Sequence, residues 1–220
     1  MERIEEIITR LEKAYPDVKR TALNWETPLD ILVATILSAQ TTDVKVNEVT
    51  ERLFKKYRTA EDYVKASREE LENDIHSLGF FHQKAKFIQE ACRQIIEEFE
   101  GLVPNRMEDL IKLKGVARKT ANIVLSNAFG INEGIAVDTH VMRLSKRLGL
   151  TRNNDRYKIE GDLMEIVPRE KWFGFSNLII AHGRRICSAQ KPRCGSCMLN
   201  DLCPSAFTFT SSKGQKSESN

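Results

Sequence analysis

Four cysteines near the C-terminal end constrain this 220-residue chain more than any other feature. Cys187, Cys194, Cys197 and Cys203 form the pattern C-x6-C-x2-C-x5-C. Because four thiolates can surround one inorganic centre completely, this spacing predicts a structural metal site, which would make a loop-rich terminus rigid. The spacing alone leaves both zinc and an iron–sulfur cluster open.

Two disulfides are the other arrangement that four cysteines allow. The first residues, among them Glu2, Arg3 and Glu5, match neither a signal peptide nor a transit peptide, so we expect a cytoplasmic protein. Disulfide pairing would also leave a fifth cysteine, Cys92, without a partner. In this compartment the four-cysteine pattern indicates metal binding rather than oxidation.

The composition is that of an ordinary globular protein, with 41% hydrophobic and 30% charged residues. The strongest apolar run, 31–37, is bounded by Asp30, Ser38 and Gln40. A run of this length is too short to span a membrane, so we expect no membrane partner.

The charges are unevenly distributed, although the net charge is only +3. The segment 106–147 holds eight basic and four acidic residues, and the segment 184–193 holds four basic residues and no acidic one. A chain polarised in this way can present a basic face to phosphate groups. Two solvated helix faces would give the same pattern, and the charges alone do not decide between the two.

Helical periodicity dominates the sequence, and no convincing alternating strand is present. An apolar stripe over residues 4–11 ends before Pro16. A further helix is predicted to start near Pro28, and the predicted N-caps of the helices that follow are Asp43, Thr59, Ser67 and Asn105. The segment 208–220, rich in serine and lysine, is predicted to be a disordered tail. The chain is therefore predicted to be all-α, with a small cysteine-rich terminal module.

The segment Leu113–Ala121 predicts a helix, a tight turn at Gly115 and a second helix. The first backbone N–H groups of the second helix lack partners within the helix and lie at the positive end of its dipole. They can therefore bind a phosphate oxygen without reading a base sequence. An ordinary helical hairpin packed in a core is the alternative.

Lys119 falls in the first turn of that second helix. The helix dipole and the adjacent Arg118 both disfavour a charged amine at this position. A neutral lysine is a nucleophile that can form a Schiff base, and a lysine that contacts phosphate is the alternative.

Asp138 lies in the run Val137–Val141, just before another helical pattern. Its first interpretation is structural, as the N-cap of that helix. The same geometry would keep its carboxylate ionised, as a partner of a developing cation requires. The roles of cap and catalyst are compatible here.

Taken together, these residues resemble the endonuclease III family of helix–hairpin–helix DNA glycosylases. The resemblance covers nearly the whole chain, to about Pro204. The motifs that follow one another in the family's order and spacing are Leu37–Asp43, Gly79–Ala85, the hairpin, Val137–His140, His182–Arg184 and the four cysteines. Several independent matches in order make the resemblance highly specific.

The resemblance implies two all-α domains that flank a DNA cleft. One is a six-helix domain with the hairpin, 22–130, and the other is a cluster domain formed by 1–21 together with 131–207. The resemblance also implies that the four cysteines hold a [4Fe–4S] cluster, which orders a basic loop at 190–193 and is not the lyase catalyst. Cys92 has no counterpart in this motif and is predicted to be a buried apolar residue.

The resemblance assigns roles to individual residues. It implies that Lys119 is the nucleophile and Asp138 its acidic partner. Gln40 would fill the space of an extruded base, and Phe80 would act as an apolar wedge near the opposite base. The family commonly has leucine at that position, and a buried core phenylalanine is the alternative for Phe80. His182 is predicted to be a buried histidine of the core or beside the cluster. The other predicted DNA contacts are Gly115, Val116, Ala117, Arg118, Thr120, His140, Lys191 and Arg193.

The hairpin departs from the family at two positions. Lys114 and Ala117 stand where the family usually has proline and a second glycine. Ala117 is predicted to need ordinary helical φ and ψ values and to lose some close approach of the backbone. Phosphate binding should survive, because it depends on N–H groups that alanine retains.

The implied activity is that of a bifunctional DNA glycosylase and abasic-site lyase of base excision repair. Such an enzyme would act, as a monomer at the nucleoid, on double-stranded DNA with a damaged base or an abasic site. It would remove oxidised or damaged pyrimidines through a lysine Schiff base and nick the strand 3′ to the abasic site by β-elimination. A mismatch glycosylase for thymine or adenine is one alternative, although such relatives generally lack the hairpin lysine. A non-catalytic helix–hairpin–helix module, which forms no covalent intermediate, is the other.

Overall fold

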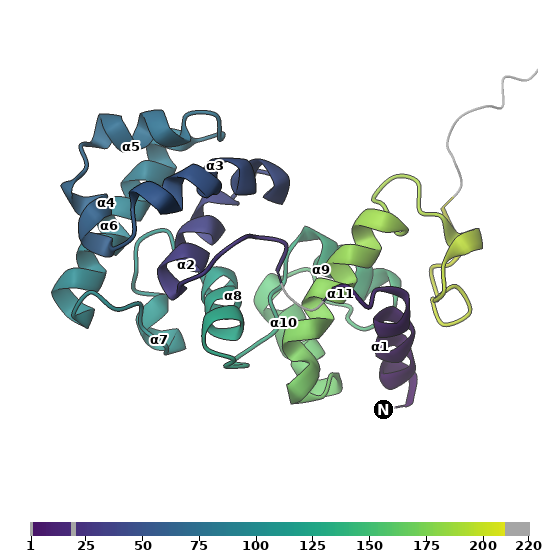
Figure 1. Ribbon diagram of the computed structural model, residues 1–220. Coiled ribbons are helices and arrows are strands. Elements are labelled where there is room, and N and C mark those ends of the chain that lie inside the picture. The colour runs from purple at the N-terminus through teal and green to yellow at the C-terminus, as the bar shows by residue number, and fades with distance from the viewer. Residues whose placement is uncertain (1, 19–20, 210–220) are drawn as a thin grey trace, which may run out of the picture. The chain divides into compact units, whose positions relative to one another are not determined.

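The computed structural model describes residues 2–18 and 21–209, and within these ranges every regular element is helical (Figure 1). This confirms the all-α prediction. The chain divides into two compact units, residues 20–136 and residues 1–19 with 137–220. Residues 131–136, assigned above to the cluster domain, group here with 20–130. Most of the predicted disordered tail, 210–220, lies outside the described residues.

The unit 20–136 is a bundle around one apolar helix. Its helices are α2 (Pro28–Leu37), α3 (Asp43–Lys56), α4 (Ala60–Lys65), α5 (Arg68–Ile75), α6 (Phe81–Phe99), α7 (Met107–Leu110) and α8 (Arg118–Ala128). Every residue of α2 from Leu29 to Leu37 is buried, and α2 packs against α3, α6 and α8. A helix that is apolar on all sides belongs in a core, which explains its central position.

The starts of these helices follow local capping chemistry. Thr59 and Ser67 cap α4 and α5 through their hydroxyl groups, as predicted. The other two predicted caps are wrong by one residue. Thr42, not Asp43, caps α3 by accepting the N–H of Lys45, which places Asp43 in the first turn, where a carboxylate is favoured by the dipole. The N-cap of α7 is Arg106 rather than Asn105.

The second unit is built around α11 (Trp172–Arg185), which packs against α1 (Glu2–Ala14) and α9 (Thr139–Arg147) (Figure 1). Its other helical segments are α10 (Arg156–Ile166), η1 (Arg169–Lys171) and η2 (Cys194–Ser196). The predicted apolar stripe of the first helix is confirmed, because Ile4, Ile7, Ile8 and Leu11 are all buried.

A glycine allows α9 and α11 to approach closely. A Cβ atom added at Gly183 would lie 2.7 Å from His140 Nδ1 and 3.1 Å from Arg143 Nη2. Any larger residue at position 183 would therefore force the His140 and Arg143 side chains, or the helices themselves, to shift. None of the helices in the described ranges has the length and apolar character of a membrane span.

Candidate functional site

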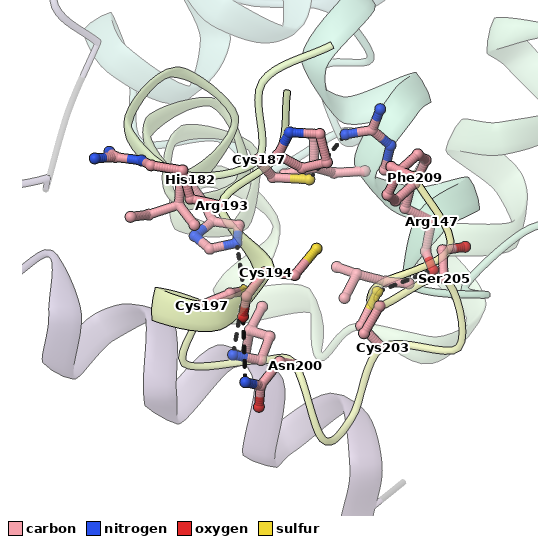
Figure 2. Close-up of a pocket in the computed structure, with 16 residues that line it drawn as sticks. Arg147, His182, Cys187, Arg193, Cys194, Cys197, Asn200, Cys203, Ser205 and Phe209 are labelled. Atoms are coloured by element: carbon pink, nitrogen blue, oxygen red, sulfur yellow. Dashed lines mark hydrogen bonds between the residues drawn. The ribbon is translucent and has the colours of Figure 1, made fainter. Parts of the chain in front are cut away.

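The four cysteines of the C-terminal pattern line one pocket (Figure 2). The pocket encloses about 400 Å³ of space, part of it open to solvent. All four side chains are half-buried, and the apolar residues that share the lining are Leu144, Leu148, Ile186, Pro192, Leu199, Ala206 and Phe209. The sequence pattern thus brings together four thiol groups in a mostly apolar setting.

Short turns carry the cysteines to the pocket. Cys187 follows α11 directly, and its N–H donates to the carbonyl of His182 at 2.9 Å. Cys194 begins η2, and the N–H of Cys197 closes that turn on the carbonyl of Cys194 at 3.2 Å. Cys203 lies between the turn 198–202 and the turn 204–207.

Hydrogen-bond donors reach two of the four sulfur atoms, those of Cys187 and Cys197. Arg147 Nη1 donates to Cys187 Sγ at 3.1 Å, and the N–H of Leu199 donates to Cys197 Sγ at 3.4 Å. Donors of this kind stabilise a thiolate. Burial raises the pKa of Cys197 and of Cys203, because partly apolar surroundings disfavour the charged form of a thiol.

His182 lies beside this pocket and is only 2% exposed, which confirms the prediction of a buried histidine. Its Nδ1 atom is 2.8 Å from the hydroxyl oxygen of Tyr15, and its Nε2 atom is 3.4 Å from Cys197 Sγ. Burial lowers the pKa of His182 to about 4, so the ring is neutral at physiological pH. The neutral ring can accept from Tyr15 and donate to the sulfur, and so orients Cys197.

The donor set fits an iron–sulfur cluster. Among the described residues, no set of His, Cys, Asp or Glu side chains converges closely enough to hold a single metal ion. The four thiols instead surround a common space (Figure 2), and a [4Fe–4S] cluster is larger than one ion and takes four cysteine thiolates. Cys92 is separate from this site: it is 1% exposed, and burial raises its pKa to about 12, as expected of an inert core cysteine.

The predicted hairpin lies in the other unit, against α6. Gly115 has a φ angle of +77°, and a Cβ atom added there would lie 2.8 Å from the Cβ of Phe87. The position therefore requires glycine both for its backbone conformation and for space. Leu113 and Val116 are buried on either side of the turn, and the N–H of Lys114 donates to Gln94 Oε1 at 2.9 Å.

Helix α8 starts directly after the turn. Ala117 is its N-cap, with extended φ and ψ angles of −90° and 167°. The prediction of helical angles at Ala117 is therefore wrong, because the residue precedes the first helical position; alanine adopts this extended conformation without strain. The first hydrogen bond within the helix joins the N–H of Ala121 to the carbonyl of Ala117 at 3.0 Å. Since alanine has no capping side chain, the amides of Lys119 and Thr120 can serve an anion.

The two candidate catalytic residues belong to different units. Lys119 is an exposed residue of the first turn of α8. Asp138 is the half-buried N-cap of α9, as predicted, and its Oδ1 atom accepts the N–H groups of His140 and Val141, both at 2.8 Å. Because both cap bonds end on Oδ1, the Oδ2 atom lies outside the cap.

Gln40 and Phe80 share an unusual backbone conformation. They are exposed, and their φ angles are +54° and +59°, in the left-handed region that non-glycine residues seldom adopt. The Phe80 side chain is 64% exposed, so the alternative of a core aromatic residue is wrong. Both residues stand at loop tips of the unit 20–136, Gln40 after α2 and Phe80 before α6.

The remaining predicted contacts lie near the cluster pocket. Half-buried His140 has its Nδ1 atom 3.1 Å from Arg143 Nη2. Lys191 and Arg193 are exposed on the loop between the first two cysteines, which is anchored by the bond from the N–H of Arg193 to the carbonyl of Ile186 at 3.0 Å.

Arg147 contacts the cysteine loops, a role that the sequence does not show, because in the sequence it is one of several basic residues in the segment 106–147. Its guanidinium also donates to the carbonyls of Ser188 and Ala189, each at 2.7 Å, and lies over the ring of Phe209 at 4.2 Å (Figure 2). No spacing rule could have found it, because it comes 40 residues before Cys187 in the chain.

Comparisons with known proteins agree with this geometry. Residues 33–169 match the family described as the HhH-GPD superfamily base excision DNA repair protein, and residues 187–203 match the iron–sulfur binding domain of endonuclease III. The chain is 56% identical over 205 residues to endonuclease III of Synechocystis sp., covering 93% of each chain. It is 45% identical to endonuclease III of Bacillus subtilis, covering 92% of each.

Solved structures show the same likeness. A trapped covalent intermediate of endonuclease III with DNA and a non-covalent endonuclease III–DNA complex both match with a TM-score of 0.89 and 45% identity. These matches cover 94% of this chain, and 97% and 96% of the chains in the two structures. The hairpin, the capped aspartate and the four-thiol pocket thus occur together in a chain that belongs to the endonuclease III family, the [4Fe–4S] DNA glycosylases and abasic-site lyases of base excision repair.

Proposed function

We propose that this chain excises oxidised or damaged pyrimidines from double-stranded DNA, with Lys119 as the nucleophile and Asp138 as its acidic partner. The observation that carries the proposal is the exposed lysine on the first turn of a helix that follows a glycine hairpin. The first-turn amides of α8 can hold a phosphate of the strand while the side chain of Lys119 remains available for chemistry. The relatives solved as DNA complexes, one of them covalent, support a DNA substrate for this chain.

The chemistry of Lys119 begins with attack of the amine lone pair on C1′ of the damaged nucleotide. The electrons of the glycosidic bond leave with the base, which takes up the proton that the attacking amine loses. Opening of the sugar ring converts the adduct to a Schiff base between Nζ and C1′. The Schiff base makes the C2′ proton acidic, and loss of that proton expels the 3′ phosphate by β-elimination, which nicks the strand.

Asp138 would stabilise the positive charge that develops on the sugar as the base departs. Its carboxylate is held in position by two backbone N–H groups on Oδ1, so Oδ2 can face the reacting sugar without a change of rotamer. A carboxylate fixed before the reaction begins needs little reorganisation in the transition state, which is the source of its catalytic effect.

Extrusion of the damaged nucleotide would be assisted by the two exposed loop tips. Gln40 would enter the vacated space, and Phe80 would wedge beside the opposite base. Gly115, Val116, Ala117, Arg118 and Thr120 would hold one stretch of backbone at the hairpin. Lys191 and Arg193, on the loop between the first two cysteines, would contact phosphates of the DNA. His140 would contact the extruded nucleotide.

The residues that would hold the cluster are Cys187, Cys194, Cys197 and Cys203. When bound, the cluster supplies a structural cross-link between the end of α11 and the turns that follow it. The cross-link would keep Lys191 and Arg193 on an ordered loop, while the lyase steps use only the side chains described above. We further propose that the enzyme acts as a monomer at the nucleoid.

A mismatch glycosylase remains a second candidate for one reason. A thermostable thymine-DNA glycosylase matches this chain with a TM-score of 0.84, although at 26% identity. The lower identity and the presence of Lys119 favour the pyrimidine-damage activity over this candidate.

A panel of duplex oligonucleotides tests the proposal. Each duplex carries one lesion or mismatch, such as thymine glycol, an abasic site or a G·T pair, and each is assayed for base release, strand nicking and borohydride trapping. We expect base release and nicking on oxidised pyrimidines and trapping on abasic DNA. Release confined to G·T pairs, without nicking, would support the second candidate instead.

A further inference from the structure

A buried lysine joins the two loops that carry Gln40 and Phe80. Lys84 lies in the first turns of α6 and is 3% exposed. Its Nζ atom donates to Thr41 Oγ1 at 2.7 Å, and its backbone N–H donates to the carbonyl of Phe80 at 3.0 Å. One residue therefore contacts the neighbour of Gln40 through its side chain and Phe80 through its main chain.

The bond to Thr41 continues into the Gln40 loop. The Thr41 hydroxyl donates to the carbonyl of Ala39 at 3.4 Å, and the N–H of Thr41 donates to the carbonyl of Ser38 at 3.1 Å. These bonds tie together the residues on both sides of Gln40. A non-glycine residue persists in the left-handed region only where its surroundings hold it there, and this chain of bonds does so for Gln40.

The energetics argue against a purely structural reason for this lysine. Within the described residues its ammonium group has no carboxylate partner, and burial lowers the pKa of Lys84. An apolar side chain of similar length would fill the same space without desolvating a charge. A costly buried cation at the junction of two strained, exposed loop tips indicates a role in what those tips do.

We propose that Lys84 is a positioning residue that holds the Gln40 and Phe80 loops in a fixed relation, so that both can act together when a nucleotide is extruded. This inference rests on the proposed function, since it assigns both loop tips to extrusion. Because Lys84 is buried, we assign it no contact with the DNA or with the reacting atoms. Its effect is largest where extrusion requires a stable base pair to be broken.

The test compares two substrates and matched variants. Single-turnover release of thymine glycol is measured in a fully paired duplex and in the same sequence with the lesion in an unpaired bubble. Lys84→Met removes the charge and keeps the length, and Thr41→Val removes the hydroxyl at constant shape. Thr41→Ser keeps the hydroxyl. Lys86→Met is the control, since exposed Lys86 lies on the same helix and, within the described residues, forms an ion pair with Glu90 at 4.0 Å.

We expect Lys84→Met and Thr41→Val each to slow base release from the paired duplex about tenfold. Release from the bubble should slow less than about twofold, because misplaced loops reduce the rate most where a base pair must first be opened. The double variant should be no slower than either single variant, since both break the same bond. Thr41→Ser and Lys86→Met should behave as wild type.

Equal losses on both substrates would show a general structural defect and overturn the inference, as would a Lys84→Met enzyme as fast as Lys86→Met. If Lys84→Met does not fold, Thr41→Val decides by the same comparison. Failure of the wild-type enzyme to release thymine glycol or to be trapped on abasic DNA would instead overturn the proposed function.

Discussion

The hairpin around Gly115 is held by packing, whereas the loops that carry the four cysteines are held by polar groups. Around the hairpin, Leu110, Leu113, Val116 and Ala121 are all buried. Between residues 187 and 203, a stretch that the structure describes in full, Leu199 is the only buried residue. Two parts of one enzyme that are proposed to grip the same DNA thus become rigid by different means.

Arginine side chains hold the cysteine loops in place through hydrogen bonds, whereas buried apolar residues hold the hairpin in place. Arg147 donates to the carbonyls of Ser188 and Ala189, Arg10 donates to the carbonyl of Met198 at 3.0 Å, and Arg3 donates to the carbonyl of Leu202 at 2.9 Å. Each bond supplies an N–H donor to a carbonyl oxygen of the loops. The ordering of the cysteine loops thus rests on these hydrogen bonds together with the cross-link that the cluster supplies, while the hairpin rests on its apolar core.

The largest expected effect separates chemistry from binding in the hairpin. Lys119→Gln should lower borohydride trapping on abasic DNA by at least about a thousandfold, because the amide cannot form a Schiff base. Duplex affinity should change less than about threefold, since one exposed charge is lost and the backbone amides remain. Lys112→Gln, at an exposed lysine paired with Asp109, is the control and should trap normally. Persistent trapping by Lys119→Gln would remove this residue from the catalytic role.

The next effect concerns the cap of α9. Asp138→Asn should slow base release about a hundredfold, because the stabilising negative charge is lost. The midpoint of thermal unfolding should stay close to that of wild type, since asparagine caps a helix about as well as aspartate. Single-turnover kinetics and a melting curve on the same preparation measure both. A stability loss as large as the activity loss would mean that Asp138 acts only as a cap.

A substitution in the cysteine loops should lower DNA affinity, in contrast to Lys119→Gln in the hairpin, which should leave DNA affinity nearly unchanged. Cys197→Ser should abolish the broad visible absorbance of the cluster and lower duplex affinity about tenfold, because Lys191 and Arg193 lose their ordered loop. Cys92→Ala is the matched control and should keep both the colour and the affinity. A colourless wild-type holoprotein, or full affinity in Cys197→Ser, would contradict the role given to the cluster.

The last effect is on stability, and it should come from breaking the packing of the hairpin. Gly115→Ala should lower the free energy of unfolding by about 2–4 kcal/mol, because it strains a positive φ angle and crowds Phe87. Gly79→Ala is the control, since an added Cβ there meets no atom within 4 Å. Urea denaturation measures both variants. Equal stability of the two variants would show that the turn accommodates a side chain at position 115. The hairpin would then depend less on tight packing than the comparison with the cysteine loops assumes.

Local signals in the sequence were sufficient for much of this structure. Hydroxyl caps at Thr59 and Ser67, the carboxylate cap at Asp138 and the glycine turn at 115 each depend on residues close in the chain. Cysteine spacing likewise predicted one shared pocket. These features follow from chemistry within a few residues, which a single sequence displays directly.

Features that depend on distant residues could not be predicted. Arg147 is bonded to the cysteine loops rather than only adding positive charge, and Lys84 is buried although lysine is usually exposed. The error at Ala117 had a local cause, since moving a helix start by one residue changes its backbone from helical to extended. The pairing of Lys119 with Asp138 stays a prediction, because it joins two units of the chain.

The bond between Gln94 and the hairpin has a consequence for how such sequences can vary. The N–H of Lys114 reaches Gln94 Oε1, and Gln94 Nε2 donates to the carbonyl of Lys112 at 3.4 Å. A proline at 114 has no N–H to offer and would leave that amide oxygen to water. Positions 94 and 114 should therefore change together among relatives, with glutamine favoured where the hairpin lacks its proline.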